Sequence, residues 1–225
     1  MSAELRAVVT IVPDEGLVSH VHTRVSGWIQ DLFIRTTGER VRRRQPLATI
    51  FSQELLASQS ELLAALSASP PGAPSPIAQG ARSRLRVFGM TPTEIASLER
   101  RGEPWRNVTI VAPRAGAVLH RGITVGTSVD PSTELFTVVD LSRVWAIAEV
   151  PEATAAQVRE GATAELDVPG SGLPPLEARV DFVYPTLSER TRTVRVRFVL
   201  ENGEGVLRPG MFGTAVIAIA ARQAL

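Results

Sequence analysis

The stretch VSGWIQDLFIRTTGERVRRRQPLATI, residues 25–50, decides the fold because its pattern returns later in the chain. Five of its residues are separated by 11, 3, 6 and 3 positions, and five later residues are separated by 10, 3, 6 and 3. The two sets are Gly27, Gly38, Val41, Leu47 and Ile50, and Gly116, Gly126, Val129, Leu135 and Val138. This agreement predicts one β-rich half-unit that is used twice; the alternative is two unrelated hairpins.

Each copy contains the signals of short strands. The segments GWIQDLFI and GAVLHRGI alternate or run apolar, and each is followed by a glycine turn, a valine and a final apolar strand, PLATIF or ELFTVV. Gly38 and Gly126 suit tight turns because glycine reaches positive φ at little cost. We therefore expect a half-barrel in each copy.

A helix is predicted after the first copy. Ser52 is placed as its N-cap, and Glu54 lies in the first turn, where the helix dipole favours a negative charge. Leucines at offsets 0, 1, 7, 8 and 11 share one face of this helix. They are Leu55, Leu56, Leu62, Leu63 and Leu66. We expect about four helical turns.

The rest of the insert turns back. Residues 67–80 contain four prolines and two glycines, which predicts a loop at the tip of a hairpin. In the return leg, Thr91 and Glu94 form a capping box, Pro92 takes the first helical position and Gly102 ends the helix. The insert is therefore predicted to be a short antiparallel helical hairpin.

Residues after Asp140 again show strand patterns. Five segments, together with ELRAVVTIV near the N-terminus, give six strands, enough for a small closed antiparallel barrel. In TRTVRVRFVL, the four apolar residues Val194, Val196, Phe198 and Leu200 face one way. One short helix is expected within residues 151–161.

Composition excludes several kinds of chemistry. All 24 basic residues are arginine, so a phosphate-binding lysine, a Schiff base and a biotinyl or lipoyl attachment point are absent from the sequence. Zero cysteines exclude disulfides, thiolate metal sites and a cysteine nucleophile. The net charge of +1 gives no long-range field toward nucleic acid or an anionic membrane. With no catalytic triad context, HExxH or phosphate loop, we expect a protein that is not an enzyme.

Membrane and targeting signals are also weak. The longest apolar run, near Ala215 to Ala221, is shorter than the roughly 20 residues of a membrane-spanning helix. The first residues, MSAELRAVV, lack the pattern of a secretory signal. We therefore expect that a signal was removed or that the protein is cytosolic.

Candidate metal ligands are few. His20 and His22 lie two apart on a predicted strand and could hold Zn(II) or Cu(II) if Asp14 or Glu15 came near. The alternative is a pair of solvated histidines, and His120 reads as structural. Met90 and Met211 read as packing residues, because soft ions need two or three converging sulfurs. A histidine pair is thus the one metal hypothesis that the sequence offers.

Arginines form the candidate protein contact. Arg40, Arg42, Arg43 and Arg44 make a basic loop beside Gly38, which is either a solvated turn or a docking site for carboxylates of a neighbouring protein. Nucleic-acid binding would need interleaved aromatic residues, and this loop has none.

These features together resemble the periplasmic adaptor subunits, or membrane fusion proteins, of tripartite RND efflux pumps, in their heavy-metal (copper/silver) branch. The resemblance runs from about Ala7 to Ala218. Its matching strings are RVSGWIQDLFIRTTGERV, SQELLASQSELL, RLRVFGMTPTEIASLE, APRAGAVL, VDLSRVWAIAEVPE, TRTVRVRF and LRPGMFGTAVI.

The resemblance implies a mostly β fold: a lipoyl-like (barrel-sandwich hybrid) domain, an α-hairpin insert and a six-stranded antiparallel β-barrel. In lysine-bearing carrier domains the cofactor sits between the halves; here the hairpin takes that place and no cofactor is expected. The expected parts are the first barrel strand and linker, the first lipoyl-like half, the hairpin, the second half and the barrel. Their expected ranges are 1–20, 21–51, 52–104, 105–140 and 141–225.

The resemblance also implies partners. These are an inner-membrane RND transporter, an outer-membrane channel and further copies of the chain, six per pump, in the periplasm beside the inner membrane. The channel contact would lie at the hairpin tip, at Pro70, Pro71, Pro74 and Pro76. The substrate would be heavy-metal ions. Alternatives are an adaptor of an ABC-type exporter and a periplasmic metal-binding chaperone.

One position departs from the family pattern. Family members usually have glycine before QPL, whereas this chain has Arg44, and the equivalent position of the second copy is Ser132. The resemblance therefore does not predict the geometry of the turn at Arg44.

Overall fold

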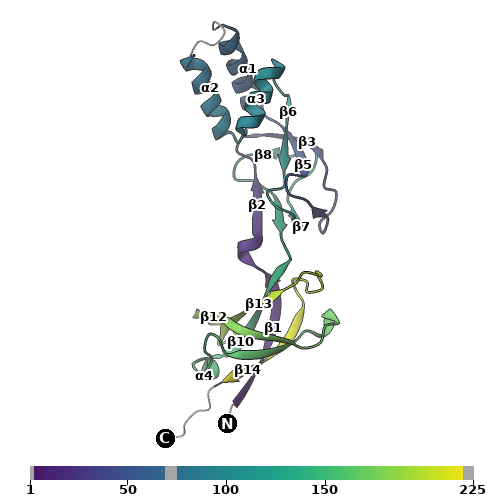
Figure 1. The fold of residues 1–225 in the computed structure, drawn as a ribbon, viewed down its shortest axis with the longest axis vertical. Coiled ribbons are helices and arrows are strands. Elements are labelled where there is room, and N and C mark those ends of the chain that lie inside the picture. Colours follow the sequence, from purple (N-terminus) through teal and green to yellow (C-terminus); the bar gives the residue numbers. More distant parts are fainter. Residues whose placement is uncertain (1–2, 69–74, 220–225) are drawn as a thin grey trace. The chain divides into compact units, whose positions relative to one another are not determined.

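The computed structural model describes residues 3–68 and 75–219. The chain divides into two compact units, Met1–Val18 with Asp140–Leu225 and Ser19–Val139, each of which is described by itself (Figure 1). Within the described residues, no helix is long and apolar enough to cross a membrane.

The first unit is a closed antiparallel barrel of six strands, as the sequence predicted. The order around the barrel is β1-β10-β13-β12-β11-β14. The strands are β1 (Ala3–Pro13), β10 (Arg143–Pro151), β11 (Thr163–Asp167), β12 (Leu176–Ser188), β13 (Thr193–Glu201) and β14 (Phe212–Ile219). The short helical elements are η1 (Glu15–Leu17), α4 (Glu152–Ala155) and η2 (Pro169–Ser171). Helix α4 confirms the short helix expected within residues 151–161.

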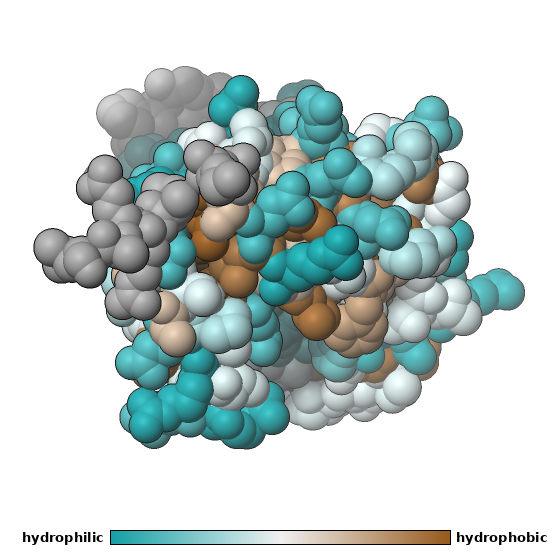
Figure 2. All heavy atoms as spheres, turned by 90° about the horizontal axis from the view of Figure 1, so that it is seen from below, coloured by the Kyte–Doolittle hydropathy of each residue, from teal (hydrophilic) through white to brown (hydrophobic). Residues whose placement is uncertain are grey.

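The barrel core follows the predicted alternation. Along β13, Val196, Phe198 and Leu200 are buried, Val194 is half-buried and Arg195 is exposed. Because successive side chains of a strand point to opposite faces, the arginines between the core residues lie on the outer wall. Figure 2, seen from below, shows hydrophobic residues reaching the surface near the middle of the view, interrupted by hydrophilic ones.

The second unit contains two four-stranded sheets, in the orders β2-β9-β7-β4 and β6-β5-β3-β8. The strands of the first copy are β3 (Gly27–Leu32), β4 (Arg40–Val41) and β5 (Pro46–Phe51). Those of the second copy are β7 (Gly116–Arg121), β8 (Ser128–Val129) and β9 (Glu134–Val139). The flanking strands are β2 (Val18–His22) and β6 (Asn107–Val111). Each copy lends its shortest strand to the other, since β4 pairs with β7 and β8 pairs with β3.

The two glycine turns are equivalent. The Gly38 amide donates to the Val118 carbonyl at 2.7 Å, and the Gly126 amide donates to the Ile29 carbonyl at 2.8 Å. Their φ angles are 89° and 83°, which glycine adopts without a Cβ clash. The prediction of two matching halves is therefore confirmed, and each turn is bonded to the strand of the other half.

Three helices lie between the halves: α1 (Gln53–Ser67), α2 (Pro76–Val87) and α3 (Pro92–Arg101). The Ser52 hydroxyl accepts from the Leu55 amide, as expected of an N-cap. Thr91 and Glu94 form the predicted capping box, and Gly102 ends α3 with φ 73°. The local signals of these helix ends were therefore correct.

The predicted loop at 67–80 is too long. Helix α1 reaches Ser67, and α2 already begins at Pro76, so residues 76–80 are helical. The Ser75 hydroxyl caps the Ala78 amide, and proline at the first helical position has its φ preset and lacks only an amide that the helix does not use. Pro76 is thus a helix start, while Pro70, Pro71 and Pro74 lie outside the described residues.

Candidate docking surfaces

The arginine side chains of residues 40–44 lie on the surface. Arg40 begins β4, Arg42, Arg43 and Arg44 follow it, and all four residues are exposed. Within residues 3–68 and 75–219, no carboxylate lies within ion-pairing distance of their guanidinium groups. The structure thus leaves these four cations available to a partner.

The backbone of this turn is held by the same bonds in both copies. The Gln45 amide donates to the Arg42 carbonyl at 3.0 Å, and the Arg42 amide donates to the Gln45 side chain at 2.9 Å. In the second copy, Thr133 and Asp130 make the same two contacts, at 3.0 and 3.2 Å. The two turns therefore have the same pair of hydrogen bonds at equivalent positions, and the side-chain acceptor is Gln45 in the first copy and Thr133 in the second.

The departure at Arg44 is visible in its backbone. Arg44 has φ 66°, in the left-handed region where a side chain costs about 1–2 kcal/mol. Its amide nonetheless donates to the Ala112 carbonyl at 2.8 Å, which holds the residue in this conformation. The turn geometry is therefore kept without the family's glycine, at the cost of local strain.

Asp130 organises the equivalent turn of the second copy. Its carboxylate accepts from the Ser132 hydroxyl at 2.6 Å and the Ser132 amide at 2.8 Å, and also from Thr133. The Ser132 hydroxyl and these further donors lower the pKa of the Asp130 carboxyl, because they favour its charged form. This turn carries an anion where the first carries arginines.

The histidines are placed on the surface of the second unit. His20 is exposed on β2, and its Nδ1 lies 3.0 Å from Glu134 Oε1. The Thr137 hydroxyl, followed by His20, lowers the pKa of the Glu134 carboxyl. His22 is also exposed. No group of three or more histidine or acidic residues suited to a metal ion occurs in the part of the chain that the structure describes, so the His20 and His22 site stays a prediction.

The methionines and Trp28 have packing roles. Met90 is buried in the hairpin core, and Met211 packs against the barrel core. Trp28 is 47% exposed, because the alternation of β3 turns Ile29 inward instead. The Trp28 ring stacks on Phe51 with centroids 6.4 Å apart. The tryptophan therefore covers the outside of the sheet.

A buried amide at the base of the hairpin was missed by the sequence reasoning. Gln59 is fully buried; its Oε1 accepts from the Trp105 amide at 2.9 Å, and its Nε2 donates to the Trp105 carbonyl at 3.1 Å. Its position between Leu55 and Leu62 on the apolar face was the available signal, since a polar residue there needs partners. Gln59 ties α1 to the chain that leaves α3.

The barrel wall carries arginines stacked on aromatic rings. The Arg195 guanidinium lies 4.5 Å from the Tyr184 ring centre, and that of Arg197 lies 4.3 Å from the centre of Trp145. Arg197 also bonds Asp181 through Nε at 2.7 Å. Such cation–π contacts are worth about 0.5–2 kcal/mol each. They hold the outer faces of β10, β12 and β13 in a fixed arrangement.

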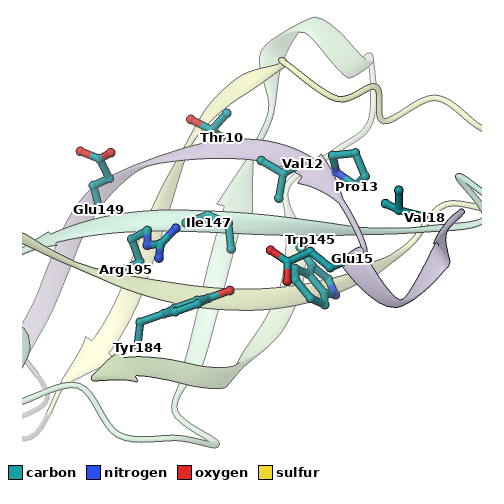
Figure 3. A pocket seen from close by; sticks show the side chains of 10 residues that line it. All are labelled: Thr10, Val12, Pro13, Glu15, Val18, Trp145, Ile147, Glu149, Tyr184 and Arg195. Atoms are coloured by element: carbon teal, nitrogen blue, oxygen red, sulfur yellow. The ribbon is translucent and has the colours of Figure 1, made fainter. Parts of the chain in front are cut away.

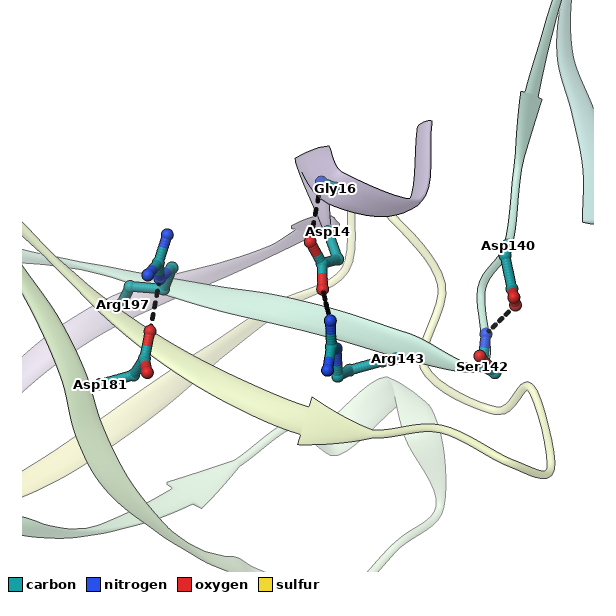
Figure 4. A network of polar contacts seen from close by, with 7 residues as sticks. All are labelled: Asp14, Gly16, Asp140, Ser142, Arg143, Asp181 and Arg197. Atoms are coloured by element: carbon teal, nitrogen blue, oxygen red, sulfur yellow. Dashed lines mark hydrogen bonds and ion pairs between the residues drawn. The ribbon is translucent and has the colours of Figure 1, made fainter. Parts of the chain in front are cut away.

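An ion pair between the buried carboxylate of Asp14 and the exposed side chain of Arg143 joins the end of β1 to the start of β10 (Figure 4). The Asp14 carboxylate accepts from the Gly16 amide at 2.9 Å and from Arg143 Nε and a terminal nitrogen, each at 2.7 Å. The Asp140 amide donates to the Leu17 carbonyl at 3.1 Å. These bonds join the two places where the chain leaves the barrel, and they engage Asp14, one of the two acidic residues considered as a third metal ligand.

This architecture defines an adaptor-type protein: two interleaved β-halves with a helical hairpin at their junction, a closed barrel, and exposed surfaces that have no catalytic constellation among the described residues. Residues 18–139 match the family model described as CusB, barrel-sandwich hybrid domain, and residues 143–221 match the CusB-like, beta-barrel domain. The chain belongs to the CusB-like family of periplasmic adaptors, the heavy-metal branch of the RND membrane fusion proteins, as the resemblance predicted.

Curated relatives agree with this assignment. The chain is 28% identical to the putative membrane fusion protein SilB of Salmonella typhimurium, over 85% of this chain and 44% of SilB. It is 26% identical to the cation efflux system protein CusB of Escherichia coli K12, over 85% of this chain and 46% of CusB. The chain thus spans less than half the length of these relatives.

Solved structures show the same fold. ZneB from Cupriavidus metallidurans aligns with a TM-score of 0.68 and 23% identity, covering 98% of this chain and all of that one. MacA from Actinobacillus actinomycetemcomitans aligns with a TM-score of 0.63 and 22% identity, covering 98% of this chain and 79% of MacA. At this identity the alignments speak for the fold alone.

Proposed function

We propose that the chain is the periplasmic adaptor of a tripartite efflux pump, where it links an inner-membrane RND transporter to an outer-membrane channel and serves the export of heavy-metal ions. The observation that carries this proposal is the matching of two adaptor family models, in order, over residues 18–139 and 143–221. The proposed work is assembly and not catalysis, which agrees with the family of the chain.

The heavy-metal assignment is supported by the names of relatives. These are the cation efflux system protein CusB and the cobalt-zinc-cadmium resistance protein CzcB of Cupriavidus metallidurans, the latter 28% identical over 89% of this chain and 42% of CzcB. We propose the same class of substrate here.

Three surfaces would make the contacts. We propose that the hairpin tip, which includes Pro70, Pro71, Pro74 and Pro76, meets the channel. The turn of Arg40, Arg42, Arg43 and Arg44 would contact a neighbouring copy or the transporter, because guanidinium groups form forked bonds to carboxylates. Six copies would complete the pump. No nucleic acid or cofactor is involved in this proposal.

A photocrosslinking experiment in cells tests the placement. Ile77, the second residue of α2, is 66% exposed, and Phe212 on the barrel is 67% exposed, so the two positions form a matched pair for a photoreactive residue. We expect capture of an outer-membrane channel from position 77 and not from position 212. Capture of only soluble proteins from position 77 would overturn the proposal.

The same experiment separates the two transporter classes. We expect position 212 to capture an RND transporter, whereas an ABC-type exporter in its place would support the alternative adaptor. A metal-binding chaperone is tested by calorimetry with Zn(II) and Cu(I) on the double variant His20→Ala, His22→Ala. Metal uptake equal to that of the unchanged chain would eliminate a chaperone that uses these histidines.

A further inference from the structure

We propose that a cavity in the barrel wall accepts an arginine side chain from the arginine turn, residues 40–44, of a second copy of this chain. The inference rests on the proposed function, because an adaptor that surrounds a transporter must contact its neighbours. It adds the residues and the chemistry of that contact.

The cavity has a volume of about 310 Å³ and lies on the outside of the barrel (Figure 3). Side chains of β1, β10, β12 and β13 line it, together with Glu15 of η1 and Val18 at the start of β2. Trp145 and Tyr184 supply aromatic walls, and Thr10 lies at its upper rim in the view of Figure 3. Ligand pockets start at about 300 Å³, so this one suits a single long side chain.

The cavity offers negative charge that the described residues do not neutralise. Glu15 and Glu149 line it and are exposed, and neither forms an ion pair or a side-chain hydrogen bond within the described ranges. Its one cation, Arg195, stacks on Tyr184 and leaves a net charge of one negative unit, from two glutamates and one arginine. A cationic side chain is therefore the complementary occupant.

Arginine is the cation that fits these walls. Arg195 and Arg197 stack on Tyr184 and Trp145, so both aromatic rings of the cavity already pair with guanidinium groups. A guanidinium group can stack on an aromatic face and bond a carboxylate with its fork at the same time, which an ammonium group does less well. The chain contains no lysine, so in a contact between copies the occupant is arginine.

The arginine turn is the matching donor. Its four guanidinium groups have no carboxylate partner among the described residues. In the sheet register, Arg40 is opposite Ala117, and Ala117 is opposite Val139, the last residue before the chain passes to the barrel. The turn therefore lies at the end of its own unit from which the chain crosses over.

The cavity occupies the corresponding end of the barrel unit. Pro13, Glu15 and Val18 line it, and Val18 is the last residue of that unit before the crossover. The arginine turn and the cavity thus each lie at the end of their own unit where the chain crosses over, and every copy carries one arginine turn and one cavity. Contacts between two different surfaces of identical chains are heterologous and close into a ring when the rotation permits. A ring of adaptors is the assembly that the proposed function requires.

Cysteine crosslinking tests the contact, because the chain has no cysteine of its own. One tagged copy carries Thr10→Cys in the cavity, and a second copy with another tag carries Arg40→Cys at the first residue of the turn. A short thiol crosslinker is then added, and a product that carries both tags consists of two different copies. Thr163→Cys, on an exposed residue of β11 outside the cavity, is the matched control.

We expect the Thr10 and Arg40 pair to give about tenfold more mixed dimer than the Thr163 control, with a yield that falls as salt screens the charges. Glu15→Arg in the acceptor copy removes the excess, and Arg42→Glu in the donor copy restores it. A yield equal to the control in folded protein at low salt, or a yield unaffected by Glu15→Arg, overturns the inference.

Failure of this contact is distinguishable from failure of the proposed function. If position 77 captures the channel while no mixed dimer forms, the inference alone is wrong. If the mixed dimer forms and no channel is captured, the copies associate as inferred and the bridging function is wrong.

Discussion

The buried amide of Gln59 gives the sharpest stability prediction, through the substitution Gln59→Leu. Leucine replaces the amide with an apolar side chain of similar size, and it removes both partners of Trp105, the acceptor of its amide at 2.9 Å and the donor to its carbonyl at 3.1 Å. The variant therefore strands two backbone groups at the base of the hairpin.

The expected cost follows from those two groups. An unsatisfied buried donor or acceptor costs about 1–3 kcal/mol, and the lower half of this range applies because Trp105 is only half-buried. Two groups at about 1–2 kcal/mol each give about 2–4 kcal/mol. Added apolar burial of the leucine returns about 1 kcal/mol. The net loss in the free energy of unfolding of this unit is about 1–3 kcal/mol.

Urea unfolding followed by tryptophan fluorescence measures this loss, and hydrogen exchange of the Trp105 amide locates it. Gln53→Leu is the control, since Gln53 begins the same helix and is exposed. We expect faster exchange at Trp105 in Gln59→Leu and unchanged exchange in Gln53→Leu. Equal stability and equal exchange in the two variants would refute the role assigned to the buried amide.

Further predictions concern the turns and α2. Arg44→Gly raises the free energy of unfolding by about 0.5–1 kcal/mol, because relief of the left-handed backbone outweighs the added entropy of the unfolded chain, whereas Arg43→Gly, without positive φ, lowers it by a similar amount. Gly80→Ala, on the exposed side of α2 with open space for a Cβ, raises it by about 1 kcal/mol. Asp130→Asn makes the free energy of unfolding less dependent on pH in the acid range, because Ser132 lowers the pKa of the Asp130 carboxyl in the folded chain. The stabilisation by the Asp130 carboxylate is present above the unfolded pKa and is lost as the pH falls through the folded pKa.

Each of these is measured by urea unfolding, at neutral pH for the glycine and alanine variants and over an acid series for Asp130→Asn. A destabilised Arg44→Gly variant would mean that the arginine side chain contributes more than the strain of its backbone costs. An unchanged acid profile in Asp130→Asn would mean that the turn of the second copy is equally stable with a neutral acceptor.

Local signals explain how much of the fold could be predicted. The caps at Ser52 and Thr91 depend on residues within three positions, and the repeat around Gly27 and Gly116 depends on turns that need positive φ at fixed spacings. Such features are written in short stretches of sequence. The alternation in β13 likewise follows from the two-residue period of a strand.

Features that depend on residues far apart in the sequence could not be predicted from local patterns. Strands β4 and β8 contain only two residues each, so nothing local announces that each pairs with the other half. Gln59 and its partner Trp105 are 46 positions apart. The barrel cavity is formed mostly by side chains of β1, β10, β12 and β13, and β1 is more than 120 residues from the other three strands in the sequence. The helix start at Pro76 was missed for a different reason, because the prolines around it were read together as a loop.

Strands β5 and β6 are hydrogen-bonded neighbours. Phe51 and Asn107 lie directly opposite each other on these strands, and they are the residues at which the chain leaves the sheet for the helical insert and returns from it. The distance between Phe51 and Asn107 is set by the pairing of the two strands and does not depend on the number of residues in the insert. Adding one turn to α1 and one to α2 would lengthen the helical hairpin by about 5.4 Å and leave the pairing of β5 with β6 unchanged. The span of such an adaptor is therefore a dimension that evolution, or an engineer, can change in steps of one helical turn.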